Sequence, residues 1–303
     1  MKAIFLIHLF VLIVWSISPD VAYASAGVPT GEILKLGGSA RSASLGEAAA
    51  ADSLDATILF YNPAGLAYQK QGTARLTHGL LPESITYDVA GVAYPFTGLG
   101  TLAVGFQNLS YGSFNSLDNT GVNDGTVSPR DTAATMAWGG TMGSGVAVGL
   151  GVKYISLKIT RSVSAMAFDF GMQKKVGRLA LGLSVNNLGS DVKYNSVSEK
   201  LPATARVGAA YQFEQISLLA DFIRPFDDPS WLAVGIEYMP VHSTSTGIAI
   251  RVGYNTIASK TEELNGFTAG FGVNLSRWNL DYAFIPLGVL GNTHWFAIGL
   301  KWE

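Results

Sequence analysis

Residues 146–154 read Val146-Ala147-Val148-Gly149-Leu150-Gly151-Val152-Lys153-Tyr154, and this stretch decides the fold. Bulky apolar residues alternate strictly with small or polar ones, which is the period of a β-strand with two unlike faces. A strand in a water-soluble sheet buries its bulky side chains and exposes charged ones. Here the second face carries too little charge for a surface bathed in water. It suits a narrow lumen, while the bulky face suits contact with lipid.

The same alternation returns along the chain after residue 72. We expect strands at 73–80, 84–95, 98–110, 130–141, 144–160, 163–175, 177–188, 202–213, 215–224, 230–240, 246–255, 265–275, 277–287 and 294–302. An even number of strands, most with about ten residues, is typical of bacterial membrane barrels. The sequence therefore predicts an all-β fold: a transmembrane antiparallel up-and-down β-barrel of about 14 strands.

Loop lengths predict the direction of the barrel. If both termini face the periplasm, the connections 111–129, 189–201 and 256–264 are extracellular, and these are the long ones. Long outer loops and short periplasmic turns are the rule in such barrels. Aromatic residues near strand ends indicate interfacial girdles, although ordinary strand aromatics are the alternative. The girdle candidates are Phe213, Tyr238, Trp278 and Trp302 on the periplasmic side and Tyr111 and Tyr254 on the outer side.

Composition excludes several other classes of protein. Charged residues make up 14% of the chain, against about 25% in ordinary soluble domains. The net charge is −2, which gives no electrostatic case for nucleic acid. Cysteine is absent, so neither disulfides nor thiol chemistry is expected. No apolar run after residue 24 reaches the ~18 residues of a membrane-spanning helix.

Residues 1–24 are predicted to be a signal peptide. Lys2 supplies a positive charge, residues 3–17 an apolar core, and Ala22-Tyr23-Ala24 a cleavage site. The apolar run has about 15 residues, fewer than the ~20 that a spanning helix needs. We therefore expect export, and a location in the outer membrane of a Gram-negative-type (diderm) bacterium.

Residues 25–72 lack the alternation and are expected to form a hatch inside the lumen, with 73–303 as the barrel. Gly, Ala and Ser dominate residues 37–55, and the alanine run in 47–52 favours a helical turn. A flexible exported N-terminus is the alternative. The region ends with Asn62, Pro63, Ala64 and Gly65. Asn before Pro predicts a turn, and a hinge that moves to open a path is the functional alternative.

The stretch Tyr61-Asn62-Pro63-Ala64-Gly65-Leu66-Ala67, after a Gly/Ala-rich segment with Asp52 and Asp55, resembles the PorV/PorQ group of outer-membrane proteins. That group belongs with the FadL-type transporters of hydrophobic compounds, and residues 280–288 and 291–294 are similar to it as well. The resemblance implies a fourteen-stranded barrel whose Asn-Pro-Ala motif lies in an N-terminal hatch. It implies one of two roles. Either small hydrophobic compounds pass through the plugged lumen, or the protein is a non-transporting shuttle or anchor subunit of a secretion system.

The sequence shows no catalytic or metal-binding constellation. The three histidines of the mature chain, His78, His242 and His294, are not spaced with a serine and an orienting polar group. No His/Asp/Glu cluster has metal-ligand spacing. We expect neither an enzyme nor a cofactor or metal. The expected partners are outer-membrane lipid, a small hydrophobic molecule, and secretion or envelope proteins.

Charged residues on the small-residue face are expected to point into the lumen. They are Lys153, Arg206, Glu237, Arg251 and Asp281. These side chains line a polar path or pair with Arg41, Asp52 or Asp55 of the hatch, and pairing is favoured because buried charges must be satisfied. Glu237 and Arg251 lie on neighbouring strands and could pair with each other.

Two tryptophans, Trp231 and Trp295, also have inward parity, near the predicted extracellular mouth. Either they contact an apolar ligand or they cap the hatch.

Overall fold

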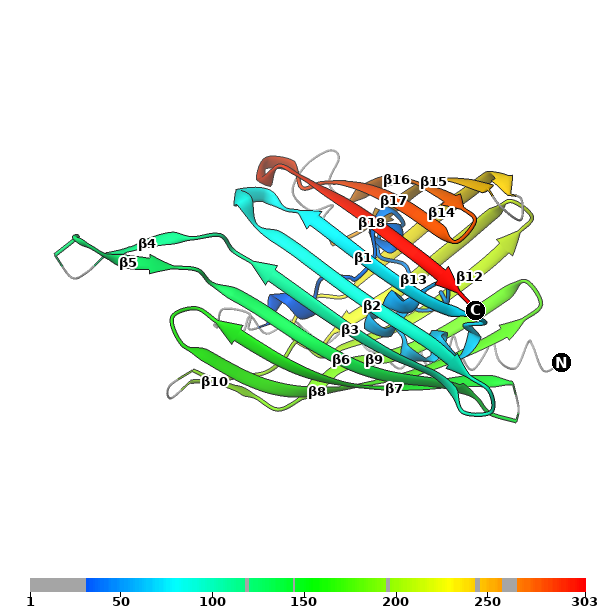
Figure 1. The fold of residues 1–303 in the computed structure, drawn as a ribbon, viewed down its shortest axis with the longest axis horizontal. Helices are drawn as coiled ribbons and strands as arrows, with labels where there is room; N and C mark the ends of the chain where they lie inside the picture. Colours follow the sequence, from blue (N-terminus) through cyan, green and yellow to red (C-terminus); the bar gives the residue numbers. More distant parts are fainter. Residues whose placement is uncertain (1–30, 118–119, 144, 195–196, 243–245, 258–265) are drawn as a thin grey trace.

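A computed structural model describes residues 31–117, 120–143, 145–194, 197–242, 246–257 and 266–303 (Figure 1). The predicted signal peptide, 1–24, and the first residues of the predicted hatch, 25–30, lie outside the described residues. No helix in the described part of the chain is long and apolar enough to cross a membrane.

Fourteen of the described strands close into one antiparallel barrel, and β1 pairs with β18 to complete the wall. The predicted all-β barrel is confirmed, with one observed strand for each predicted strand. The barrel strands are β1 Gly72–Leu80, β2 Thr86–Phe96, β3 Gly100–Ser110, β6 Arg130–Thr141, β7 Val146–Lys158, β8 Ser162–Val176, β9 Leu179–Gly189, β12 Thr204–Phe213, β13 Ile216–Pro225, β14 Trp231–His242, β15 Thr246–Asn255, β16 Phe267–Leu275, β17 Trp278–Pro286 and β18 Asn292–Trp302.

Two further hairpins lie in connections that the sequence predicts as loops. β4 Phe114–Leu117 pairs with β5 Asn123–Val127, and β10 Val192–Tyr194 pairs with β11 Val197–Glu199. These strands are too short to carry a readable alternation. The β4–β5 hairpin projects beyond the barrel (Figure 1). We call the end of the barrel that carries these hairpins the long-loop end, and the opposite end, where β1 begins and β18 finishes, the terminal end.

The helices in the described residues are all short. α2 Ala40–Ser44 and the 3-10 turns η1 Glu32–Leu34, η2 Ala56–Phe60 and η3 Pro63–Tyr68 precede the barrel. Two more 3-10 turns, η4 Pro82–Ser84 and η6 Gly288–Leu290, lie in connections at the long-loop end. Glu83 and Ser84 have positive φ values of 57° and 61°, which suits a tight turn and explains why β2 begins later than the sequence predicts.

The two faces of the wall differ as expected. On β7, Leu150 and Tyr154 are exposed on the outside, whereas Gly149 and Lys153 are buried. Three of the six predicted girdle residues, Phe213, Tyr238 and Trp278, are exposed at the terminal end.

Tyr111 is an exception, and the girdle prediction is wrong for it. It directly follows β3 and continues the inward parity of Leu109. Its ring packs against the interior apolar cluster, and its hydroxyl donates to Oδ2 of Asp131 at 2.8 Å.

Candidate functional site in the barrel lumen

Residues 31–71, which we call the hatch, run through the lumen from the long-loop end to the terminal end (Figure 1). At the long-loop end, Nζ of Lys35 donates to Asp228 in the β13–β14 connection at 2.6 Å. At the terminal end, the chain enters β1 at Gly72, opposite Trp302 of β18. The hatch therefore contacts both mouths of the barrel.

Asn62 ties two parts of the hatch to the wall. Its side chain is fully buried, and Oδ1 accepts from the backbone N–H of Ala64 at 3.1 Å, which caps η3. Nδ2 donates to the carbonyl oxygens of Ala50 at 2.6 Å and of Met172, on β8, at 3.2 Å. Pro63 occupies the first position of η3, where a missing N–H costs nothing. The Asn-Pro-Ala motif thus forms a capped turn docked on the wall.

Glycines on the inner face let the hatch approach the wall closely. A Cβ added at Gly139 would lie 2.7 Å from the Pro63 carbonyl oxygen and 2.8 Å from the Ala67 nitrogen, closer than the 3.0 Å that real Cβ atoms keep. The backbone of the hatch therefore packs directly on the backbone of the wall, as glycine within a strand permits. The sequence pattern alone does not show this role of the glycines. The glycine belt consists of Gly105, Gly139, Gly149, Gly171, Gly182, Gly208, Gly235, Gly253 and Gly270.

Alternating charges join the hatch to one side of the wall. Three arginines and four carboxylates form this ion-pair ladder, in the order Asp52, Arg41, Glu237, Arg251, Asp281, Arg75 and Asp55. The hatch supplies both end carboxylates and Arg41, whereas β14, β15, β17 and β1 supply the other members. The structure therefore brings six of the predicted charged residues together, and it adds Arg75, which the sequence alone does not single out.

Two carboxylates bridge the ladder. Glu237 accepts from Nε of Arg251 at 2.6 Å and from Nε of Arg41 at 2.9 Å. Asp281 lies 2.6 Å from Nη1 of Arg251 and 2.6 Å from Nη1 of Arg75. All five of these side chains are nearly fully buried. Burial opposes the charge of Arg41, yet Asp52 and Glu237 raise its pKa, so the guanidinium stays protonated.

Lys153 belongs to a separate cluster within the wall. Its Nζ lies 2.9 Å from Oδ2 of Asp169 and donates to Oδ1 of Asn187 at 2.6 Å. The register between β8 and β9 shifts here, between Phe168 and Phe170, and Asn187 has a φ of 62°. The alternation over the predicted strand 163–175 places Asp169 on the inner face, so the sequence could have identified this residue. The bulge reverses the parity of Asn187, so no pattern in the sequence indicates it.

Arg206 contacts the hatch rather than the ladder. Its Nη1 donates to the carbonyl oxygen of Glu47 at 3.2 Å, and its guanidinium lies over the ring of Tyr61 at 5.6 Å. Burial raises the pKa of the Glu47 carboxyl, an effect that Arg206 and the hydroxyl of Tyr61 partly oppose. The φ of Glu47 is 72°, a conformation that non-glycine residues rarely adopt.

The alanine run after Glu47 does not form the helical turn that its composition favours. The N–H groups of Ala49 and Ala50 instead donate to Oδ2 of Asp221, on β13, at 2.9 and 2.8 Å. A wall carboxylate therefore replaces the intrahelical acceptors, a tertiary effect that helix propensity cannot anticipate. Asp221 is an inward-facing residue that the sequence alone does not single out.

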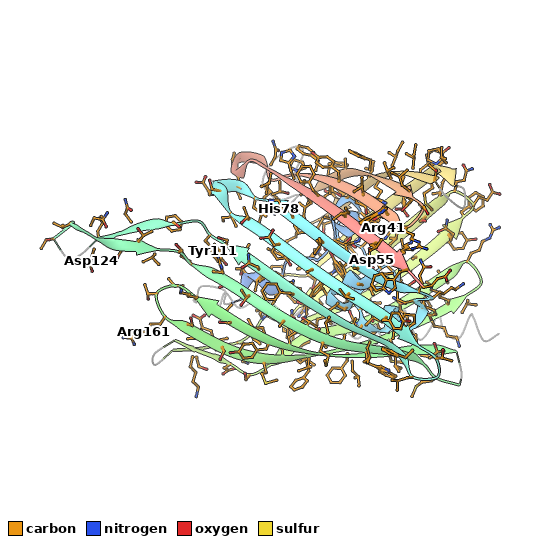
Figure 2. All side chains as sticks on the ribbon, viewed as in Figure 1. Arg41, Asp55, His78, Tyr111, Asp124 and Arg161 are labelled. Atoms are coloured by element: carbon orange, nitrogen blue, oxygen red, sulfur yellow. The ribbon has the colours of Figure 1, made fainter. Side chains whose placement is uncertain are left out.

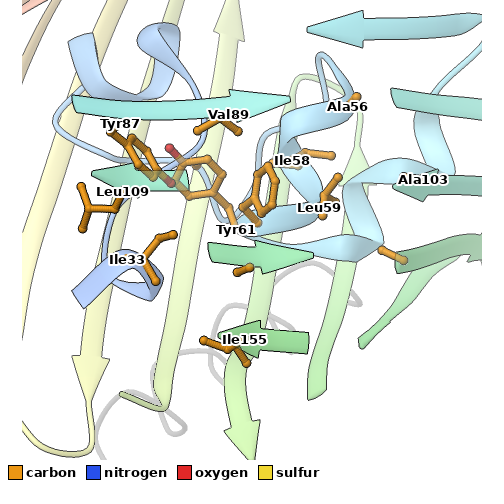
Figure 3. Close-up of a cluster of buried hydrophobic side chains, with 14 of the residues drawn as sticks. Ile33, Ala56, Ile58, Leu59, Tyr61, Tyr87, Val89, Ala103, Leu109 and Ile155 are labelled. Carbon is orange, nitrogen blue, oxygen red and sulfur yellow. The ribbon is translucent and has the colours of Figure 1, made fainter. Parts of the chain in front are cut away.

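The lumen at the long-loop end is filled by bulky apolar side chains. Tyr87, Leu109 and Ile155 of the wall meet Ile33 and Tyr61 of the hatch (Figure 3). The expectation of a uniformly small inner face is wrong here. Small wall residues are needed only where the hatch backbone approaches, and the wall's own side chains fill the rest. The apolar cluster also includes Leu157, Val192, Leu201 and Trp295.

The two predicted mouth tryptophans lie in different surroundings. Trp295 is 4% exposed and meets Tyr87 edge to face, with ring centroids 5.4 Å apart. Trp231 packs against a second cluster that contains Leu45 and Ala48 of the hatch. Trp295 therefore lines the apolar cluster, whereas Trp231 covers the hatch.

Cavities border the hatch toward both ends of the lumen. A cavity of about 240 Å³ at the terminal end is lined by Asp52 and Leu54 of the hatch and by Lys175 and Arg178 of the wall. A cavity of about 30 Å³ lies between Leu36, Tyr61 and Trp231, large enough for about one water molecule.

The described residues include no group of three or more His, Asp or Glu that could hold a metal ion. Two histidines lie on the outer face, where His78 contacts Asp88 at 2.7 Å and His294 contacts the Tyr282 hydroxyl at 2.8 Å. The side chain of His242 lies outside the described part of the structure.

Comparison with known protein families and with curated proteins finds no match for the sequence. Solved structures do match the fold. The toluene transporter TodX of Pseudomonas putida has a TM-score of 0.60 and 10% identity over 88% of this chain and 97% of its own. The toluene transporter TbuX of Ralstonia pickettii has a TM-score of 0.52 and 12% identity over 88% and 99%. A Pseudomonas aeruginosa FadL homologue has a TM-score of 0.54 and 12% identity over 86% and 98%. The chain therefore has the fold of a FadL-type barrel.

Proposed function

We propose that this barrel stands in the outer membrane of a diderm bacterium and passes small hydrophobic compounds through its plugged lumen. The terminal end then faces the periplasm, and the long-loop end faces the outside. The fold shared with two toluene transporters and a FadL homologue supports this role. So does the outer face, whose bulky apolar side chains suit lipid.

The apolar cluster at the long-loop end is the observation that carries the proposal. A lumen for ions or sugars would be lined by polar groups from mouth to mouth. Here the outer half presents the buried side chains of Tyr87, Leu109 and Trp295, and the ion-pair ladder lies deeper. Charged groups within the lumen at this end are paired or hydrogen-bonded, with Lys35 on Asp228 and Asp131 on the Tyr111 hydroxyl. An apolar solute gains about 25 cal/mol for each Å² that it removes from water, so such a lining favours its entry.

Passage through the lumen requires the hatch to shift. Where Tyr61 meets the outer half of the lumen, the remaining cavity has about 30 Å³, room for about one water molecule. Below it, the glycine belt and the ion-pair ladder hold the hatch against the wall. A monoaromatic compound therefore needs a local displacement of the hatch.

A reversible cross-link between hatch and wall tests this role. A Cβ built at Gly91 of β2 lies 3.5 Å from Cβ of Ala56 in η2, within the range of about 3.5–4.5 Å that a disulfide needs. The chain has no cysteine, so Ala56→Cys with Gly91→Cys introduces a single possible bond. Uptake of toluene and of a panel of other apolar compounds is compared between wild type, a deletion strain and the double variant.

We expect uptake to need the protein, to fall when the double variant is oxidised, and to return on reduction. Each single cysteine variant should transport in both states. Equal uptake by the deletion strain and wild type would exclude transport of these compounds. Uptake that survives the oxidised cross-link would show that η2 stays in place during passage.

A protein partner is the second candidate role, as expected for a secretion shuttle or anchor of the PorV type. The projecting β4–β5 hairpin favours it, because Phe114, Leu117 and Val122 are exposed there by 56%, 62% and 61%. Exposed apolar residues on a projecting element are typical of an interaction site. Co-purification of a stoichiometric protein that is lost when 114–127 is removed would support this role, whereas recovery of the isolated chain would count against it.

A further inference from the structure

Three cations gather on the outside of the wall at the long-loop end. Arg130 begins β6, Lys158 ends β7, and Arg161 lies in the turn before β8. All three are exposed, and Figure 2 shows Arg161 pointing away from the barrel. In the described structure, none of them forms an ion pair with a carboxylate. The three side chains therefore form a positively charged patch on the outer face.

The register places two of these cations directly opposite each other. Arg130 pairs with Lys158 across the β6–β7 ladder, and both side chains have outward parity. Like charges directly opposite on neighbouring strands are destabilising. The arrangement therefore costs free energy unless an anion lies between the two groups.

The residues below the cations change character in regular steps. The next outward row is Thr132, Ser156 and Ser164, paired in register across β6, β7 and β8. The rows beneath are apolar, and they run Ala134, Tyr154 and Met166, then Met136, Val152 and Phe168. Cations, hydroxyls and apolar side chains thus follow one another from the rim toward the middle of the wall.

We propose that this outer face of β6, β7 and β8 binds a phosphorylated lipid of the surrounding membrane leaflet. Its phosphate lies between Arg130, Lys158 and Arg161, and its acyl chains lie on the apolar rows. Guanidinium and ammonium groups are the usual partners of phosphate. A free phosphate ion would use the cations alone, whereas a lipid also uses the apolar rows that continue directly beneath them. The proposal requires only that the barrel stands in a membrane, and it is independent of what passes through the lumen.

Binding of diphosphorylated lipid A to the full-length protein in a zwitterionic detergent tests the proposal. The variants are Arg130→Gln, Lys158→Gln, Arg161→Gln and the triple variant. Arg178→Gln is the matched control, because Arg178 is an exposed arginine at the opposite rim. A cation near an anionic lipid surface contributes about 1 kcal/mol, so each substitution should weaken binding about fivefold and the triple variant about hundredfold. Binding should also weaken as salt is added.

Two further measurements distinguish a lipid phosphate from a free phosphate ion and test whether the acyl chains contribute to binding. Inorganic phosphate should compete poorly, and Phe168→Ala should weaken binding of lipid A without changing binding of phosphate. Binding by the triple variant as tight as by wild type would overturn the proposal. So would inorganic phosphate binding as tightly as the lipid, which would indicate a free-phosphate site.

Stability supplies an independent readout. Without lipid A, Lys158→Glu should raise the thermal midpoint, because it replaces a like-charge pair with an opposite pair. Added lipid A should raise the midpoint of wild type more than that of Lys158→Glu, which keeps only two of the three cations. An equal rise in both proteins would contradict the proposed site.

Discussion

Gly139→Ala tests whether the hatch is held by backbone packing against the glycine belt. The new Cβ would lie 2.7 Å from the Pro63 carbonyl oxygen and 2.8 Å from both the Ala67 nitrogen and Cβ of Leu66. Ordinary contact begins at 3.4 Å, so η3 must move away from β6 by about 0.6–0.7 Å at three points. All three atoms belong to a single turn, so rotation of one side chain cannot relieve the contact.

Overpacking of this kind costs about 1–3 kcal/mol. The substitution also recovers about 0.5–1 kcal/mol, because alanine loses less backbone freedom than glycine when a strand forms. The net loss in the free energy of unfolding should therefore be about 0.5–2 kcal/mol, with looser attachment of the hatch. Gly91→Ala is the matched control, because its nearest neighbour, Cβ of Ala56, lies at an ordinary 3.5 Å. This variant should be as stable as wild type or slightly more so.

The assay is urea unfolding in lipid vesicles, combined with limited proteolysis of the hatch. We expect Gly139→Ala to lower the midpoint and to expose the hatch to protease, and Gly91→Ala to do neither. If the two variants unfold alike and their hatches resist protease equally, the close packing of η3 on β6 is refuted.

Three other perturbations address single contacts in the lumen. Glu237→Gln leaves Arg41 and Arg251 without their shared carboxylate and should lower the free energy of unfolding by about 3–5 kcal/mol; a thermal midpoint equal to that of wild type would contradict the ladder. Asn62→Ala removes the side-chain acceptor of the Ala64 N–H and leaves Gln173 as the remaining donor to the Ala50 carbonyl, and it should cost about 1–3 kcal/mol, measured by the same unfolding assay. Because burial raises the pKa of Glu47 above its ordinary 4.5, its contribution to stability is complete below pH 4.5 and is lost as the pH rises through the raised value. Glu47→Gln should remove this part of the pH dependence, and an unchanged profile would show that Glu47 does not cause it.

The barrel could be predicted from sequence because each strand alternates between a bulky and a small face. The predicted range 130–141 coincides with β6, and 246–255 coincides with β15. Parity also predicts that Glu237 and Arg251 face the lumen, where the structure pairs them. Local pattern suffices wherever neighbouring strands share a regular register.

The remaining features depend on contacts between distant segments. The carboxylate of Asp221 accepts from the N–H groups of Ala49 and Ala50. No local sequence pattern around these residues indicates that interaction. The β-bulge beside Asn187 breaks the alternation from which parity is read. Whether an inner-face residue is small or bulky depends on how closely the hatch approaches it, and strand periodicity contains no information about that distance.

The ion-pair ladder has a consequence for biogenesis. Arg75 belongs to the first barrel strand and Asp281 to β17, so their contact spans the seam where β1 meets β18. Arg75 also pairs with Asp55, which precedes the first strand. Closure of the barrel between β1 and β18 and docking of the hatch in the lumen therefore depend on the same side chains. If the barrel closed while the hatch was still outside the lumen, Arg75 and Asp281 would be buried without Asp55. We therefore expect insertion of the hatch and closure of the barrel to occur in one cooperative step.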